Sequence, residues 1–93
     1  MVKLIPARPS FAQDMSDTER SIMLRHLEYW KELMKKGIVI VFGPVMDPAG
    51  VYGMGIVELS SEEELQPILD ADPATSINRY ESYPMRAITA ANV

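Results

Sequence analysis

The stretch that decides the fold runs from His26 to Pro44 and reads HLEYWKELMKKGIVIVFGP. Its first part has apolar side chains at helical spacing, and Gly37 after two lysines is typical of a helix end. Its second part is apolar from Ile38 to Phe42 and largely β-branched, which is typical of a strand. The stretch therefore predicts a helix that leads through a glycine into a buried strand. It also holds the single histidine of the chain.

The predicted helix begins upstream at Ser16, because Ser16 and Glu19 have the spacing of a capping box. At about 100° per residue, one side of this helix is apolar and the opposite side is charged. The apolar line consists of Met23, Leu27, Trp30 and Met34. His26 falls inside the apolar sector, one turn before Trp30, so we expect it to point inward rather than toward solvent.

The apolar run from Ile38 to Phe42 fits a central strand that is buried on both faces of a sheet. A chain of 93 residues can cover one face with its own helices and has little left for the other face. A second subunit is the simplest cover for that face. This strand therefore predicts a homodimer.

The rest of the chain adds three strands and a second helix. The strands are expected at 2–8, 51–58 and 80–88, and the second helix starts at 60. Prolines at 6 and 9 confine the first strand to a sheet edge or end it early, and Pro84 places the last strand near an edge. Residues 9–14 should form a loop, and Pro67 should shorten or kink the second helix. Asp72 should cap a short helical turn that begins at Pro73.

This order, β-α-β-β-α-β, predicts an α+β sandwich with helices on one face of an antiparallel sheet, the ferredoxin-like arrangement. Residues 1–93 should form a single domain with a tail at 89–93. The formal charge of −4, with nine basic and thirteen acidic residues, leaves no positive face for nucleic acid. No stretch resembles a signal peptide or a membrane helix, and no cysteine is present, so we expect a cytoplasmic protein.

Composition also narrows the chemistry. Without cysteine there is no thiolate and no sulfur-ligated metal, and neither a phosphate-binding loop nor a metal-ligand spacing is present, so no cofactor or metal is predicted. A histidine that works as general acid or base, steered by a carboxylate, remains. Glu19, Asp70 and Asp72 are candidate partners. His26 could equally be a core residue, and Asp72 could be only a helix cap.

One strand leaves room for a ligand. Gly53 and Gly55 lie on the same face of the strand at 51–58, because side chains alternate along a strand. The missing side chains leave space either for packing of a helix or for a small molecule.

The combination of His26, the helix end at Gly37, Gly43-Pro44, the glycine-bearing strand and the segment DADP at 70–73 resembles the YCII-related (YciI-like) family. The segments at 8–9, 14–15 and 83–85 are similar to one subgroup of it. The resemblance covers nearly the whole chain. It implies a ferredoxin-like fold that dimerises as a dimeric α+β barrel, with an active site of one histidine and one aspartate that match His26 and Asp72.

Some relatives in this family resemble dehydrochlorinases, and the wider fold group includes muconolactone isomerases and monooxygenases. The resemblance thus implies cofactor-independent elimination or isomerisation of a small organic acid, a chlorinated ring or a lactone-like ring. His26 would transfer the proton and Asp72 would orient it, in a cleft bordered by Trp30 and by Gly43 and Pro44. Arg8 is the candidate to hold an anionic group of the substrate.

Two other functions stay open. The first is a non-catalytic dimeric module of the same fold that binds a small ligand or a partner, and the second is a monooxygenase that needs no cofactor. Geometry separates the enzyme from the non-catalytic module. A His26 ring within hydrogen-bond reach of Asp72 and facing a cleft favours the enzyme, whereas a His26 sealed in the core excludes it.

Overall fold

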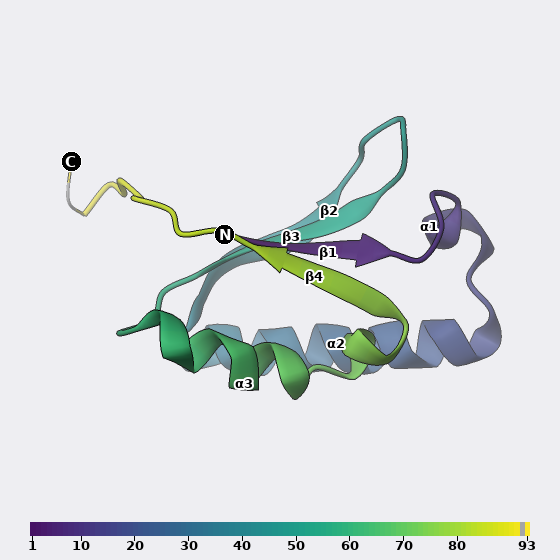
Figure 1. Ribbon diagram of the computed structural model, residues 1–93, viewed down its shortest axis with the longest axis horizontal. Helices are drawn as coiled ribbons and strands as arrows, with labels where there is room; N and C mark the ends of the chain where they lie inside the picture. The colour runs from purple at the N-terminus through teal and green to yellow at the C-terminus, as the bar shows by residue number, and fades with distance from the viewer. Residues whose placement is uncertain (92) are drawn as a thin grey trace.

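The computed structural model describes residues 1–91 and 93. A four-stranded antiparallel sheet carries its two longest α-helices on one face (Figure 1). The strands are β1 (Val2–Pro6), β2 (Val39–Val45), β3 (Tyr52–Val57) and β4 (Asn78–Ser82). The helical elements are α1 (Phe11–Asp14), α2 (Asp17–Lys35), η1 (Glu62–Glu64), α3 (Leu65–Asp70) and η2 (Pro73–Ser76). The strand order is β2-β3-β1-β4, which confirms the predicted ferredoxin-like α+β fold.

Helix α2 begins and ends where the sequence predicts. The Ser16 side chain accepts a hydrogen bond from the Glu19 N–H at 3.1 Å, and the Glu19 carboxylate accepts from the Ser16 N–H at 2.9 Å, so the capping box is complete. At the other end, Gly37 has a φ of 79°. The Ile38 N–H donates to the Leu33 carbonyl at 3.0 Å, as in a Schellman motif. Local sequence therefore sets both ends of α2.

The predicted central position of the strand at 38–42 is wrong. Strand β2 lies at one edge of the sheet, and the exposed fractions of Ile40 and Val41 are 45% and 51%. The pairing with β3 shifts between Val39 and Val41, so Ile40 is an extra residue in a bulge. Helices α2 and α3 lie on the same face of the sheet (Figure 1). The apolar run of β2, which would suit burial on both faces, is therefore covered by the described helices on one face.

Three other boundaries also differ from the sequence-based predictions. Residues 11–14 form the one-turn helix α1 instead of a loop, and the side chain of Phe11 is buried. Strand β1 stops at Pro6 and lies centrally, between β3 and β4, so this strand ends early and is not at an edge. Strand β4 is an edge strand, as predicted, but it spans Asn78–Ser82 and ends before Pro84, which has no N–H to donate.

The segment between β3 and β4 divides into three short helical pieces, η1, α3 and η2, which agrees with a second helix shortened near Pro67. Residue 92, within the predicted tail at 89–93, lies outside the described residues. No helix in the described part of the chain is long and apolar enough to cross a membrane.

The core lies between α2 and the sheet. Its buried members are Val2, Trp30, Leu33, Val39 and Leu69. The Trp30 ring lies over Gly55, where an added Cβ atom would be 2.7 Å from Cζ3 of the indole. The ring therefore approaches the sheet closely only because position 55 has no side chain.

Replacement of Gly55 by alanine should therefore destabilise the fold. The added methyl group must displace Trp30, and we expect the free energy of unfolding in urea to fall by about 1–3 kcal/mol. Gly43→Ala is the matched control, because a Cβ atom at position 43 meets nothing within 4 Å and its effect should stay within about 0.5 kcal/mol. Equal stability of the two variants would contradict the proposed role of Gly55.

Candidate active site

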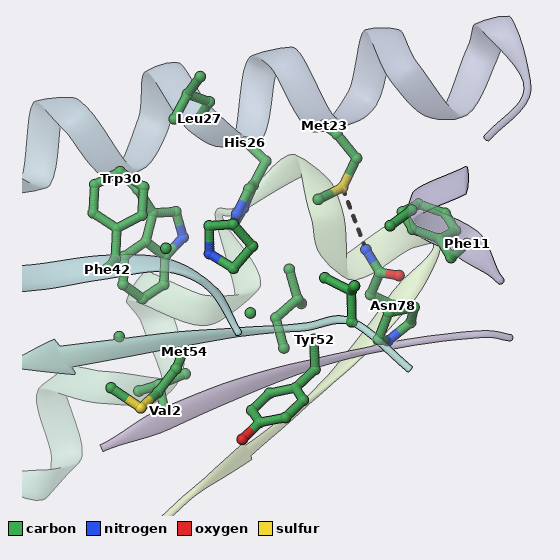
Figure 2. Close-up of a pocket in the computed structure, with 18 of the residues that line it drawn as sticks. Val2, Phe11, Met23, His26, Leu27, Trp30, Phe42, Tyr52, Met54 and Asn78 are labelled. Carbon is green, nitrogen blue, oxygen red and sulfur yellow. Dashed lines mark hydrogen bonds between the residues drawn. The ribbon is translucent and has the colours of Figure 1, made fainter. Parts of the chain in front are cut away.

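A cavity of about 280 Å³ lies between α2 and the sheet, and α1 contributes to one side of it (Figure 2). Its walls are mainly apolar, with Trp30 and Phe42 among them. No lysine, arginine, aspartate or glutamate lines it. His26 projects from α2 into this space, and the exposed fraction of its side chain is 15%. The histidine is therefore neither on the outer surface nor sealed in the packed core.

The structure brings His26 and Asp72 together. Nδ1 of the His26 ring is 2.8 Å from Oδ2 and 3.0 Å from Oδ1 of Asp72. Asp72 reaches this position as the cap of η2, because its Oδ1 atom also accepts a hydrogen bond from the Ala74 N–H at 2.9 Å. The capping role that the DADP segment predicts is confirmed, and the same carboxylate contacts the histidine as well.

Two further side chains donate to the Asp72 carboxylate. The Trp30 indole N–H lies 2.6 Å from Oδ2, and the Tyr80 hydroxyl makes a short hydrogen bond to the same atom. Asp72 is only 2% exposed. Burial by itself raises the pKa of Asp72, but the hydrogen bonds from His26, Tyr80, Ala74 N–H and Trp30 outweigh it and hold the pKa below its ordinary value. The carboxylate is therefore ionised at neutral pH.

This ionisation determines which nitrogen of His26 can act as a base. A carboxylate only accepts hydrogen bonds, so the proton of a neutral imidazole must sit on Nδ1, facing Asp72. Nε2 then carries a lone pair, and it has no hydrogen-bond partner within residues 1–91 and 93. The free nitrogen belongs to a ring that lines the cavity. Chemically, this arrangement can accept a proton from a bound molecule.

Tyr80 is held neutral by the same group. Burial, together with the hydrogen bond to Asp72 and its negative charge, raises the pKa of Tyr80. Its hydroxyl proton is therefore committed to the carboxylate. Tyr80 stabilises Asp72 and does not act as an acid toward the cavity.

The other predicted site residues divide into two groups. Trp30, Gly43 and Pro44 line the cavity together with His26. Arg8 does not line it: its guanidinium lies 2.7 Å from the Asp14 carboxylate and 2.8 Å from the Glu19 carboxylate. The structure therefore does not bring Arg8 to the cavity, and its contacts join α1 to the start of α2.

The two alternative carboxylate partners of His26 have other contacts. The hydrogen bond from Arg8, with that from the Ser16 N–H, lowers the pKa of Glu19 to about 2. Asp70 is exposed and accepts a hydrogen bond from the Gln66 amide at 2.7 Å. Of the three candidates, the hydrogen bonds of His26 go to Asp72 alone.

Tyr80 and Asn78 line the cavity, and sequence reasoning did not identify them as site residues. Both come from β4, two residues apart, and therefore face the helices. The proximity of Tyr80 to Asp72 depends on the crossover between β3 and β4, so no local pattern could reveal it. Of the two alternatives for the glycine strand, packing of a helix is confirmed at Gly55, which makes room for Trp30 of α2. Both Gly53 and Gly55 line the cavity, and binding of a small molecule there stays a prediction.

A metal site finds no support in the part of the chain that the structure describes. No group of three or more histidine, cysteine, aspartate or glutamate residues there could hold a metal ion.

Comparison with known proteins agrees with this architecture. The family model of the YCII-related domain matches residues 1–89, and the chain belongs to the YCII-related domain family. The resemblance seen in the sequence is thereby confirmed. A search of curated proteins gives no match.

Asp72→Asn should destabilise the protein, since an amide cannot accept hydrogen bonds at both ends from the donors that surround Asp72. We expect the free energy of unfolding at pH 7 to fall by about 2–4 kcal/mol. Asp70→Asn is the matched control, because this carboxylate is exposed, and it should change stability by less than about 0.5 kcal/mol.

The same pair of variants reports on pH dependence. Because the folded pKa of Asp72 lies below its ordinary value of 3.8, the unfolded chain binds the proton first as the pH falls. The stabilisation from the carboxylate is present above about pH 5 and is lost as the pH falls through 3.8 toward the lower folded pKa. Urea unfolding at several pH values should show a steeper acid loss in the wild type and Asp70→Asn than in Asp72→Asn. Identical slopes would contradict the lowered pKa.

Proposed function

We propose that this protein is a small single-domain enzyme of the cytoplasm that transfers a proton within an organic substrate, with His26 as the base and Asp72 as its orienting carboxylate. One observation carries the proposal: the His26 ring is bound through Nδ1 to a buried carboxylate, while it lines an apolar cavity of about 280 Å³. A histidine with only a packing role would be surrounded by core side chains and would not line a cavity of this size.

The reaction follows from the free lone pair on Nε2. This nitrogen removes a proton from a carbon next to a carbonyl group, which leaves an enolate, and the resulting imidazolium is stabilised by Asp72. Return of the proton to a different carbon completes an isomerisation. Departure of an adjacent leaving group with its electron pair, such as chloride, completes an elimination. Both outcomes share the first step and need no electron transfer.

The remaining lining residues would hold the substrate. Trp30, beside His26 with ring centroids 6.0 Å apart, forms one wall, and Gly43 and Pro44 of β2 border the cavity as well. The proposed substrate is a small organic acid or a chlorinated or lactone-like ring compound, by analogy with the reactions of some relatives and of the wider fold group.

A non-catalytic module that binds a small ligand is the second candidate function. The cavity itself favours it, since an apolar space of this size would bind a small molecule whether or not a reaction followed. The two candidates differ in what happens to a carbon-bound proton of the ligand.

Proton exchange tests the first step without knowledge of the product. In D2O, the wild type should exchange the hydrogen next to the carbonyl in at least one member of a panel of lactones, cyclic enones and chlorinated cyclic ketones, followed by ¹H NMR. His26→Gln should lower the exchange rate roughly 10²–10⁴-fold while the fold stays intact, because the general base is missing.

Glu32→Gln, on the exposed side of α2, is the control and should exchange at the wild-type rate. Unchanged exchange in His26→Gln would assign the base elsewhere. Binding of panel members without exchange in the wild type would favour the non-catalytic module. Loss of folding in His26→Gln would indicate a core role for the histidine.

We also propose that the protein is a homodimer joined through the uncovered face of the sheet. Strand pairing and side-chain alternation direct the following residues to that face: Lys3, Ile5, Val41, Tyr52, Met54, Ile56, Arg79 and Glu81. They combine apolar side chains, mainly on β2 and β3, with side chains of both charges on β1 and β4. A surface of this kind can be complementary to itself in a two-fold interface.

Val41→Glu should therefore weaken the dimer. Val41 is 51% exposed on that face, and a carboxylate at this position would lose its hydration when it is buried against a second copy. Sedimentation velocity should show the wild type as a dimer and the variant shifted to monomer at the same concentration. Leu24→Glu is the control, because Leu24 is 64% exposed on α2, and it should leave the dimer intact. A monomeric wild type would refute the interface.

A further inference from the structure

Asn78 lines the cavity, and its hydrogen bonds are incomplete. It is the first residue of β4, and Tyr80, two residues further on, lines the same cavity. Its Nδ2 donates to the Met23 sulfur at 3.5 Å (Figure 2). Its Oδ1 atom is buried and has no hydrogen-bond partner in the described part of the chain. One end of this amide is thus weakly held and the other is unpaired.

The Asn78 amide would gain stronger hydrogen bonds from a suitable ligand. A thioether sulfur is a weak acceptor, and a buried carbonyl oxygen without a donor keeps the full cost of its lost hydration. The last torsion of an asparagine is broad, so the amide group can turn toward the cavity at small cost. A ligand that offers a donor there would satisfy Oδ1.

The other polar side chains near the cavity have other contacts or another proposed role. The Tyr80 hydroxyl donates to Asp72. The His26 ring is bound to the same carboxylate through Nδ1, and its Nε2 atom is the proposed base that takes the substrate proton. Tyr52 points away from α2 (Figure 2). Asn78 is therefore the side chain left to recognise a polar group on the ligand.

The cavity also selects on charge and size. No cationic side chain lines it, and Arg8 is already paired with Asp14 and Glu19, so an anionic ligand would lose its hydration without a counter-charge. A dry apolar cavity of about 150 Å³ binds benzene. The cavity here, at about 280 Å³, has room for a single ring with substituents.

We propose that the cavity binds an uncharged molecule of about one substituted ring, whose hydroxyl or amino group is held by the amide of Asn78. This inference rests on the proposed function, in that it takes the cavity to be the substrate site. It favours the ring compounds over the small organic acids among the proposed substrates. Asn78 is thereby a specificity-determining residue that does not take part in the proton transfer.

Three probes of similar size test the proposal: phenol, toluene and benzoate, with binding followed by chemical-shift titration of the protein. The wild type should bind phenol roughly 3- to 10-fold more tightly than toluene, as expected for one hydrogen bond, and benzoate more weakly than phenol. Asn78→Leu, which keeps the size of the side chain and removes its polar atoms, should abolish the preference for phenol. If this variant does not fold, Asn78→Ala serves in its place.

His26→Gln separates the two possible partners of the phenol hydroxyl. The preference for phenol should persist in this variant, because the proposed partner is Asn78. A preference that disappears in His26→Gln but persists in the Asn78 variants would overturn the inference. Equal binding of phenol and toluene to the wild type, tighter binding of benzoate, or no binding of phenol would overturn it as well.

The test is independent of turnover. A preference for phenol that depends on Asn78, in a protein that exchanges no carbon-bound proton, would refute the proposed enzyme and leave the ligand class standing. Proton exchange that depends on His26, without any preference for phenol, would support the proposed enzyme and refute the proposed ligand class.

Discussion

The buried carboxylate of Asp72 is the interaction on which the rest of the structure depends. It is 2% exposed and accepts hydrogen bonds from two side chains of α2, from the Tyr80 hydroxyl of β4 and from the Ala74 N–H of η2. A charge removed from water persists only where donors replace its hydration. The three elements must therefore be in place before Asp72 can be ionised in the interior, and its position joins α2 to the crossover between β3 and β4.

The same carboxylate determines which nitrogen of His26 is available as a base. An anion that accepts from Nδ1 leaves the lone pair of His26 on Nε2, in a ring that lines the cavity, and would stabilise the charge that develops when a proton arrives. Trp30 links this polar group to the apolar core, since its N–H reaches Asp72 while its ring lies over Gly55. Stability and proposed function thus depend on one cluster, so substitutions in it would affect both.

Much of the fold could be predicted from local patterns. The capping box at Ser16 and the glycine at 37 correctly delimited α2, and Asp72 was correctly expected to cap a turn, because these contacts join residues close in sequence. The position of β2 was predicted wrongly, since an apolar run does not show whether the strand has neighbours on both sides or lies at an edge of the sheet. Tyr80 and Asn78 were missed because strand alternation could not be anchored until the boundaries of β4 were known.

The sequence by itself determined the order of the four strands and of the two helices that lie between them, the inward direction of His26 and the membership in the YCII-related domain family. These follow from periodicity, capping and motif order, which are properties of neighbouring residues. Only the tertiary structure decided which carboxylate meets His26, since Asp72 lies 46 residues further along the chain. It also placed Arg8 outside the cavity and left the Asn78 Oδ1 atom without a hydrogen-bond partner in residues 1–91 and 93. Such contacts between distant segments depend on how the crossover packs against α2, which no local pattern encodes.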